Sequence, residues 1–244
     1  MSQRACPRCG KPVDEKSAFC PNCGYKMNAD TNTTEIPPPN IGYKPREESR
    51  SAMEHLTIGF NVSLSNPLVF LPTIISGIIG LAVSYLTPTS TLLSALTIML
   101  GLLSTIISFI LNFASMDMSR DAYNKQPLDL AQSIQYVMNR LGTFIVAAIF
   151  GAILSITIVL IPVVILTFVI MVLDETGILD ALGKAFKVLF ADLGDVLIIL
   201  LVSIIGSFIL GYIPFLSTLL NTALTVIIGI AFIDIYVNYK NRAI

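Results

Sequence analysis

Charged residues are scarce in this sequence, and three long stretches contain none. Asp, Glu, Lys and Arg make up 13% of the 244 residues, whereas hydrophobic residues make up 54%. A typical soluble domain is about 25% charged. The uncharged stretches are 56–116, 141–173 and 196–233. These absences exclude an ordinary soluble globular domain and predict an all-α integral membrane protein.

Few residues are suited to acid–base or ion-coupled chemistry. The only histidine, His55, precedes the first uncharged stretch, and we interpret it as a polar side chain at the membrane interface. Asp117 and Asp121 follow that stretch and are interpreted as solvated acids near a helix end. The glycine-containing metal motif of phospholipid-synthesising transferases is missing. We therefore expect neither an enzyme nor a transporter that relies on an intramembrane carboxylate.

All four cysteines lie within the first 23 residues, in two copies of the motif Cys-Pro-x-Cys-Gly. The two-residue gap lets both sulfurs of one copy reach the same ion, and the glycine permits a turn whose N–H groups point at sulfur. Four thiolates complete the closed shell of a structural Zn²⁺ ion, one per chain, and the predicted ligands are Cys6, Cys9, Cys20 and Cys23. A reduced thiolate cluster predicts a cytosolic N-terminus, and the polar first 55 residues predict no signal peptide.

This region resembles the short zinc ribbon found at the ends of many archaeal and bacterial proteins, over roughly Arg4 to Met27. The resemblance implies the same four ligands, with Phe19 and Tyr25 as a small core. Residues 1–30 hold five basic and three acidic side chains, and a zinc–tetrathiolate unit adds a charge of about −2. A ribbon that binds nucleic acid is expected to show a basic stripe with aromatic platforms. Contact with a protein is therefore favoured over a purely structural role and over nucleic acid.

The chain is predicted to have three parts. The zinc ribbon occupies 1–27 and the membrane domain 51–244. Between them, residues 28–50 contain four prolines and hardly an apolar side chain. This composition predicts a disordered, proline-rich tether.

Each uncharged stretch can hold a helical hairpin. The expected spans are Pro67–Leu86 with Thr91–Ser115, two helices that turn near Ile161-Pro162, and Val196–Gly211 with Phe215–Ile233. The middle stretch, Leu141–Leu173, is ambiguous. Its 33 residues would form one helix of roughly 50 Å, against a hydrocarbon core of about 30 Å, whereas two spans need about 40 residues. Helices that extend into the charged flanks, Met138–Val159 and Pro162–Glu175, would relieve the shortage.

The distribution of positive charge favours two helices in the middle stretch. With three hairpins, all basic residues of the loops and tail lie on the side of the zinc ribbon: Arg120, Lys125, Arg140, Lys184, Lys187, Lys240 and Arg242. A single middle span would move the last four outside. We therefore expect a multi-pass plasma-membrane protein with six spans and both termini in the cytosol. Close packing of these spans is expected at the glycines Gly77, Gly80, Gly101, Gly151, Gly206 and Gly229.

An amphipathic segment precedes each hairpin. In the first, Met53, Leu56, Phe60 and Leu64 share one helical face. The other two run from about Leu130 and from about Ile178. These segments are too short and too charged to span, so we expect them to lie in the cytosolic interface of the bilayer. The alternative is that they are ordinary helical loops.

The segment Asp174–Lys187 carries a second resemblance. An acidic residue and a glycine precede a helix of the pattern Ala-Leu-x-x-Ala, at Ala181 to Ala185. This is similar to the membrane domain found beside some bacterial glycerophosphodiester phosphodiesterases and in archaeal and bacterial six-span proteins. The serine-tryptophan pair usual in that helix is missing, because the chain has no tryptophan. No catalytic residue is implied, because the phosphodiesterase chemistry belongs to a separate soluble domain.

Together these features favour a membrane-embedded scaffold or adaptor whose zinc ribbon recruits a cytosolic protein. The alternative is that the six-helix body binds or transports a lipid or another small apolar molecule. An enzyme at the membrane interface ranks third.

Overall fold

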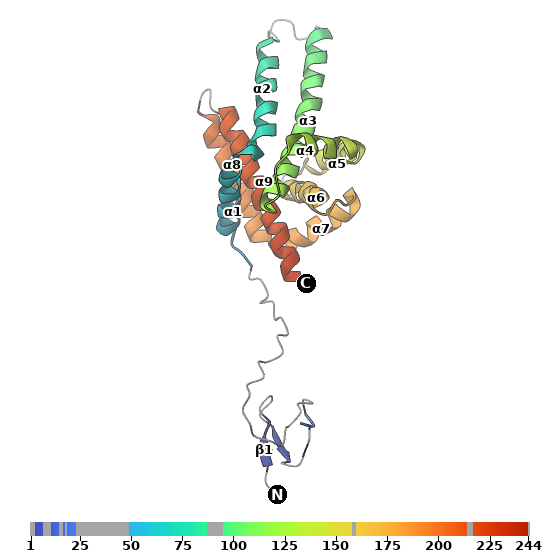
Figure 1. Ribbon diagram of the computed structural model, residues 1–244. Helices are drawn as coiled ribbons and strands as arrows, with labels where there is room; N and C mark the ends of the chain where they lie inside the picture. The colour runs from blue at the N-terminus through green and yellow to red at the C-terminus, as the bar shows by residue number, and fades with distance from the viewer. Residues whose placement is uncertain are drawn as a thin grey trace. The chain divides into compact units, whose positions relative to one another are not determined.

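The chain divides into two compact units, Met1–Pro45 and Arg46–Ile244 (Figure 1). The computed structural model describes residues 3–6, 11–14, 17, 19–22, 49–86, 95–157, 160–213 and 217–243. Most of the predicted tether, 28–50, lies outside the described residues.

The N-terminal unit contains a small antiparallel sheet. Strand β1 (Gln3–Ala5) pairs with β2 (Pro12–Asp14), and Arg4 lies opposite Val13. Directly after β1, the Cys6 amide donates a hydrogen bond of 2.9 Å to the Lys11 carbonyl. This bond continues the pairing of the two strands by one residue, so strand pairing determines where Cys6 lies.

The described regular structure of the second unit is entirely helical. In chain order its elements are α1 (Ala52–Ser65), the 3₁₀ turn η1 (Pro67–Phe70), α2 (Leu71–Leu86), α3 (Ala95–Tyr123), α4 (Leu130–Asn139), α5 (Leu141–Leu154), α6 (Ile161–Leu173), α7 (Ile178–Ala191), α8 (Leu193–Gly211) and α9 (Ser217–Ala243).

Four described helical segments are long and apolar enough to cross a membrane: Pro67–Leu86, Thr97–Tyr123, Leu193–Gly211 and Ser217–Arg242. Within the most apolar window of each of the first three, only 17% of the residues are buried inside the protein. Large apolar side chains such as Ile78, Leu102 and Phe208 are consequently exposed. A surface of this kind is suited to lipid rather than water. The chain is a membrane protein with an all-α body.

The middle stretch forms two short helices instead of one long one. Helices α5 and α6 contain 14 and 13 residues, so each is roughly 20 Å long and shorter than the hydrocarbon core of about 30 Å. Figure 1 shows both of them running across the direction of α2 and α3. Pro162 lies in the first turn of α6, as expected, where its missing N–H removes no helical hydrogen bond.

The expected extension of these two helices into the charged flanks is wrong. The chain bends by 76° between α4 and α5, and α6 ends at Leu173, before the predicted end at Glu175. If α4 and α5 together count as one broken span, the described helices supply five candidate spans. The count of six spans therefore stays a prediction.

Helices α1, α4 and α7 occupy the three segments predicted to precede the hairpins. In α1 the apolar side chains Met53, Phe60 and Leu64 are exposed. The buried face instead consists of Ala52, His55, Gly59 and Ser63. This face packs against α9 so closely that a Cβ atom at Gly59 would lie 2.5 Å from the Ile227 carbonyl oxygen. Three small residues and His55 thus provide the protein contact, and the large apolar side chains are exposed.

Helix α6 lies in the core of the helical body. Nine of its 13 residues are buried, and it packs against α3, α7 and α9. Helix α5 approaches it closely at Gly151, where a Cβ atom would lie 2.9 Å from Val164 Cγ1. At Gly206 on α8, an added Cβ atom would lie 2.9 Å from Leu224 Cδ2 on α9. The expected close packing is confirmed at these two glycines. It is wrong at Gly80, Gly101 and Gly229, where no described atom of a neighbouring element would lie within 4 Å of an added Cβ.

Two long helices continue beyond the uncharged stretches. Helix α3 extends to Tyr123 and includes Asp117 and Asp121, whereas the predicted span ends at Ser115. Helix α9 extends to Ala243 and includes Asp234. Charged residues expected in loops or a tail therefore lie on helices that are long and apolar enough to cross a membrane.

Candidate metal centre and ionic layer

The N-terminal unit brings one cysteine of each motif into the same small core. Cys6 and Cys20 are each 2% exposed and form a buried cluster with Val13. Cys9 and Cys23, the other predicted ligands, lie outside the described residues. Two thiols brought together from separate motifs fit a shared metal ion. When bound, Zn²⁺ would be held by the four cysteines and would cross-link the two loops.

The predicted core of this unit is wrong at Phe19. Its side chain is 56% exposed, and the buried apolar side chain is Val13 on β2. Tyr25 lies outside the described residues. Because Val13 and the two thiols form the core, Phe19 is left on the surface of the unit.

The carboxylate of Asp234 lies inside the helical body and is fully buried. Its Oδ2 atom lies 2.6 Å from His55 Nδ1. Its Oδ1 atom accepts hydrogen bonds from Arg50 Nη1 at 2.6 Å and from the Tyr123 hydroxyl at 2.5 Å. Burying an unpaired carboxylate costs several kcal/mol. The three partners offset that cost and attach α1 and the end of α3 to α9.

A second carboxylate, Asp174, directly follows α6 and binds three side chains. It accepts hydrogen bonds from Lys184 Nζ at 2.8 Å, from the Tyr236 hydroxyl at 2.5 Å and from Lys240 Nζ at 3.0 Å. Burial by itself raises the pKa of Asp174, but the hydrogen bonds from Lys184, Tyr236 and Lys240 outweigh burial and hold that pKa below its ordinary value. Asp174 therefore remains ionised and joins the end of α6 to α7 and α9.

Two arginines cap the C-terminal end of α6. Arg140 Nη1 donates to the Met171 carbonyl at 3.1 Å, and Arg120 Nη1 donates to the Val172 carbonyl at 3.2 Å. The last carbonyls of a helix lack helical partners and carry partial negative charge. Both guanidinium groups also lie over the Tyr136 ring, 5.3 and 5.6 Å from its centroid. The two arginines thus stabilise a helix end inside the protein.

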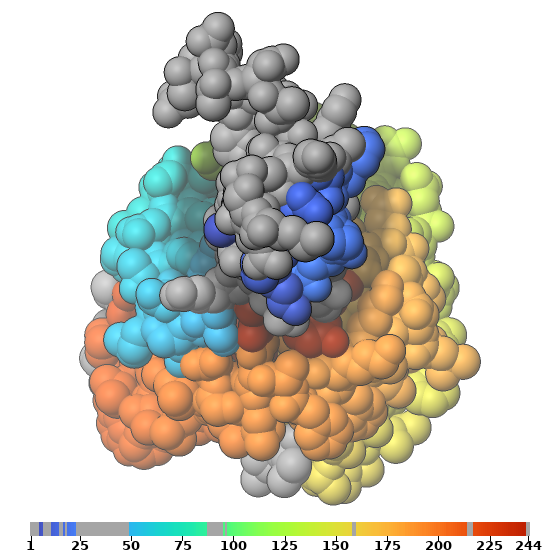
Figure 2. Space-filling model, turned by 90° about the horizontal axis from the view of Figure 1, so that it is seen from below, coloured from blue at the N-terminus to red at the C-terminus, as the bar shows by residue number. Residues whose placement is uncertain are grey.

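Further ion pairs lie at the same end of the helical body. Asp117 and Asp121 pair with Arg120 at 2.8 and 3.1 Å, and Asp192 pairs with Arg242. We call the acidic and basic members of this network the ionic layer; they are Arg50, His55, Asp117, Arg120, Asp121, Arg140, Asp174, Lys184, Asp192, Asp234, Lys240 and Arg242. Figure 2 looks onto this end, where the red C-terminal part of α9 lies between the light-blue α1 and the orange α7.

Sequence reasoning missed the ionic layer. His55 is 1% exposed and contacts Asp234, so its interpretation as an interfacial side chain is wrong. Asp117 and Asp121 are 2% and 9% exposed, so they are not solvated acids. One signal was available: Gly59 and Ser63 are small residues four positions apart, a spacing typical of a helix face that packs against another helix, and His55 lies on the same face four residues before Gly59.

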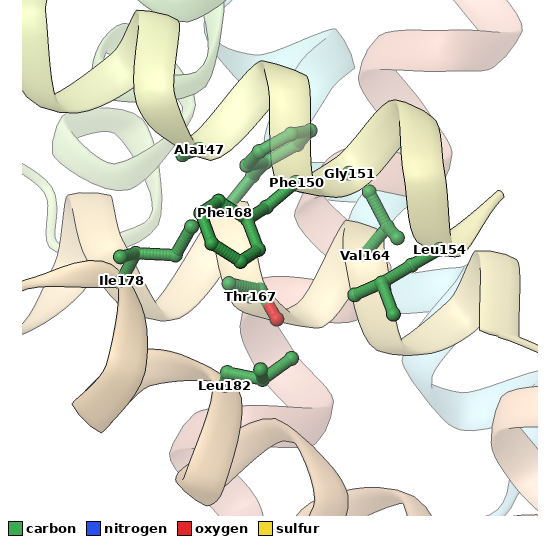
Figure 3. A pocket seen from close by; sticks show the side chains of 9 residues that line it. All are labelled: Ala147, Phe150, Gly151, Leu154, Val164, Thr167, Phe168, Ile178 and Leu182. Carbon is green, nitrogen blue, oxygen red and sulfur yellow. The ribbon is translucent and has the colours of Figure 1, made fainter.

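A small apolar pocket lies between α5, α6 and α7 (Figure 3). Its lining residues are Ala147, Phe150, Gly151, Leu154, Val164, Thr167, Phe168, Ile178 and Leu182. The volume is about 10 Å³, which is about the space that one water molecule needs. The Thr167 hydroxyl donates to the Val163 carbonyl of its own helix at 2.7 Å. This pocket is too small to hold a lipid.

Comparison with known proteins agrees with the geometry of the N-terminal unit. A zinc-ribbon domain family matches residues 2–27. No curated protein and no solved structure matches the chain. The match supports structural zinc binding by the zinc ribbon. The resemblance of Asp174–Lys187 to the phosphodiesterase-associated membrane domain finds no support in these comparisons.

Replacing Cys20 and Cys23 together by serine is expected to abolish zinc binding. Two sulfurs of a single motif cannot complete a tetrahedral thiolate shell. Elemental analysis of the purified protein should give about one zinc per wild-type chain and almost none in the variant. A control with Pro21→Ala and Asn22→Ala, between the same cysteines, should retain the metal. Full zinc content in the double serine variant would refute the four-thiolate site.

Replacing Asp234 by alanine is expected to destabilise the helical body by about 3 kcal/mol or more, because the substitution leaves buried donors without their acceptor. Thermal unfolding of the purified protein in detergent measures this. The matched control is Asp180→Ala, because Asp180 is 57% exposed and pairs with Lys184 at 3.0 Å. Exposed pairs contribute about 1 kcal/mol or less. Equal melting temperatures for the two variants would contradict the role of Asp234.

Proposed function

We propose that this chain is a membrane-embedded adaptor without enzymatic activity, whose zinc ribbon recruits a cytosolic protein. The helical body anchors the chain in the plasma membrane through its long apolar helices. The ribbon forms a separate unit at the end of the proline-rich segment. A short metal-stabilised unit of this kind can present a rigid surface without a large hydrophobic core.

The exposure of Phe19 carries this proposal. The core of the ribbon is formed by Val13 and the buried thiols, so the ribbon does not need the Phe19 ring for its own packing. Exposed aromatic side chains are frequent anchors in protein–protein contacts. The exposed residues of the ribbon also include Lys11 and Asp14, whose opposite charges favour a protein surface over the basic stripe that nucleic acid requires.

Contacts within the helical body support a location of both termini on one side of the membrane. Arg50, which precedes α1, pairs with Asp234 near the end of α9 at 2.6 Å. The chain therefore enters and leaves the body on the same face. The basic residues Arg120, Lys184 and Lys240 belong to the ionic layer on that face, which agrees with a cytosolic orientation under the positive-inside rule. A cytosolic ribbon also keeps its thiols reduced.

Binding or transport of a lipid by the body is the weaker proposal. The apolar pocket beside α6 has room for about one water molecule. A lipid carrier would need a cavity that encloses much of an acyl chain or headgroup. The adaptor proposal uses the exposed surface of the ribbon and needs no cavity.

Affinity purification from membranes tests the adaptor proposal. Proteins that copurify with the wild-type chain are expected to be lost after deletion of residues 1–30 and reduced at least tenfold by Phe19→Ala, because one buried aromatic anchor contributes about 2 kcal/mol. The control is Asn22→Ala, a change at another exposed position of the ribbon. An unchanged set of partners after deletion of 1–30 would rule out recruitment by the ribbon.

Labelling of single added cysteines in intact cells tests the topology. Ile156 lies in the turn between α5 and α6 and is 81% exposed. If the middle hairpin crosses the bilayer, a membrane-impermeant thiol reagent added outside should label Ile156→Cys. Gln126→Cys, in the exposed turn after α3, should be labelled only after permeabilisation. Protection of Ile156→Cys would show that α5 and α6 do not complete two spans.

A further inference from the structure

A polar pocket lies where the beginning of α2 meets α3 and α9. Its lining residues are Thr73, Asn112, Ser115, Met116, Ser119, Thr225, Val226 and Gly229. Its volume is about 50 Å³, enough for a small ion with one or two waters, since a water needs roughly 10–15 Å³ of such volume. Thr73, Ser115 and Ser119 are buried, whereas Asn112 and Thr225 are exposed at the edge of the pocket.

The hydroxyl groups of this pocket use their hydrogens elsewhere. Ser119 Oγ donates to the Ser115 carbonyl at 2.7 Å, and Thr73 Oγ1 donates to the Phe70 carbonyl at 3.0 Å. Asn112, Ser115 and Thr225 likewise donate to main-chain carbonyls, of Ser108, Val69 and Asn221. A hydroxyl has one hydrogen and two lone pairs. Each hydroxyl group of the pocket therefore has lone pairs left for a ligand but no hydrogen.

The ligand that suits such a pocket is a small monovalent cation. An anion would need several donors, but these hydroxyl groups no longer offer any, and the one remaining N–H hydrogen of Asn112 belongs to an exposed side chain at the edge of the pocket. Divalent cations such as Ca²⁺ and Mg²⁺ are usually bound through carboxylates, and the lining residues include no acidic side chain. Uncharged oxygens alone can replace part of the hydration shell of Na⁺ or K⁺, as carbonyl oxygens do in channel filters.

We propose that this pocket binds a monovalent cation, Na⁺ or K⁺, through the oxygens of Thr73, Asn112, Ser115, Ser119 and Thr225. The bound ion connects α2, α3 and α9, and so stabilises the attachment of the α2–α3 hairpin to the rest of the body. Gly229 forms part of the wall. A Cβ atom there would meet no described atom of a neighbouring element within 4 Å, so a larger side chain can occupy the pocket without displacing the backbone.

Thermal unfolding in different salts tests the proposal. The purified full chain in detergent is compared in equal concentrations of sodium, potassium and choline chloride, because choline is too large for the pocket. In sodium or potassium, at about ten times the dissociation constant, the melting temperature should be about 4 °C higher than in choline. The difference is expected to disappear in Ser119→Ala, which removes one ligand, and in Gly229→Val, which fills the pocket.

Two matched controls separate loss of the ion from general destabilisation. Thr105→Ala removes a hydroxyl that donates to a carbonyl of its own helix, as Ser119 does, but lies outside the pocket. Gly101→Val adds a side chain at an open glycine of α3, outside the pocket. Both should retain the cation-dependent shift. Equal melting temperatures of the wild type in all three salts, or a shift that persists in Gly229→Val, would overturn the proposal. Neither result depends on the zinc ribbon or its partner.

Discussion

The buried carboxylate of Asp234 imposes the strictest constraint on the helical body. Apolar packing is non-directional, and in a membrane lipid tails compete equally well for apolar side chains. Packing alone therefore leaves helices free to slide along one another. A buried charge does not permit this, because its partners must lie within hydrogen-bond distance. Arg50, His55 and Tyr123 meet this requirement together, so they determine the relative positions of α1, α3 and α9.

The same physical rule explains how the short helix α6 can end inside the protein. Each carbonyl at a helix end needs a donor, and lipid supplies none. Arg120 and Arg140 donate to the last carbonyls of α6, and Asp174 binds two lysines directly after it. The ionic layer thus replaces the water that would otherwise solvate this helix end. Charges that resemble loop residues in the sequence are structural parts of the body.

The two units of the chain reach stability by different means. The ribbon is too small for an adequate hydrophobic core, and its buried cluster of Val13 with two thiols indicates dependence on a metal. The body directs much of its apolar surface outward, and polar contacts at one end add to the apolar packing around α6. The exposed Phe19 and the oxygen-lined pocket are consequently available for binding, because neither is used for packing.

Patterns of residues a few positions apart predict the ribbon and most of the helices directly from the sequence. The repeated cysteine motif identifies the ribbon, and the uncharged stretches and helical periodicity locate nearly all helices, because these signals act between residues a few positions apart. Tertiary structure decided the rest. His55 and Asp234 are 179 positions apart, the chain bends between α4 and α5, and Val13 replaces Phe19 in the ribbon core. Each of these depends on which segments meet in space, and short-range periodicity carries no information about that.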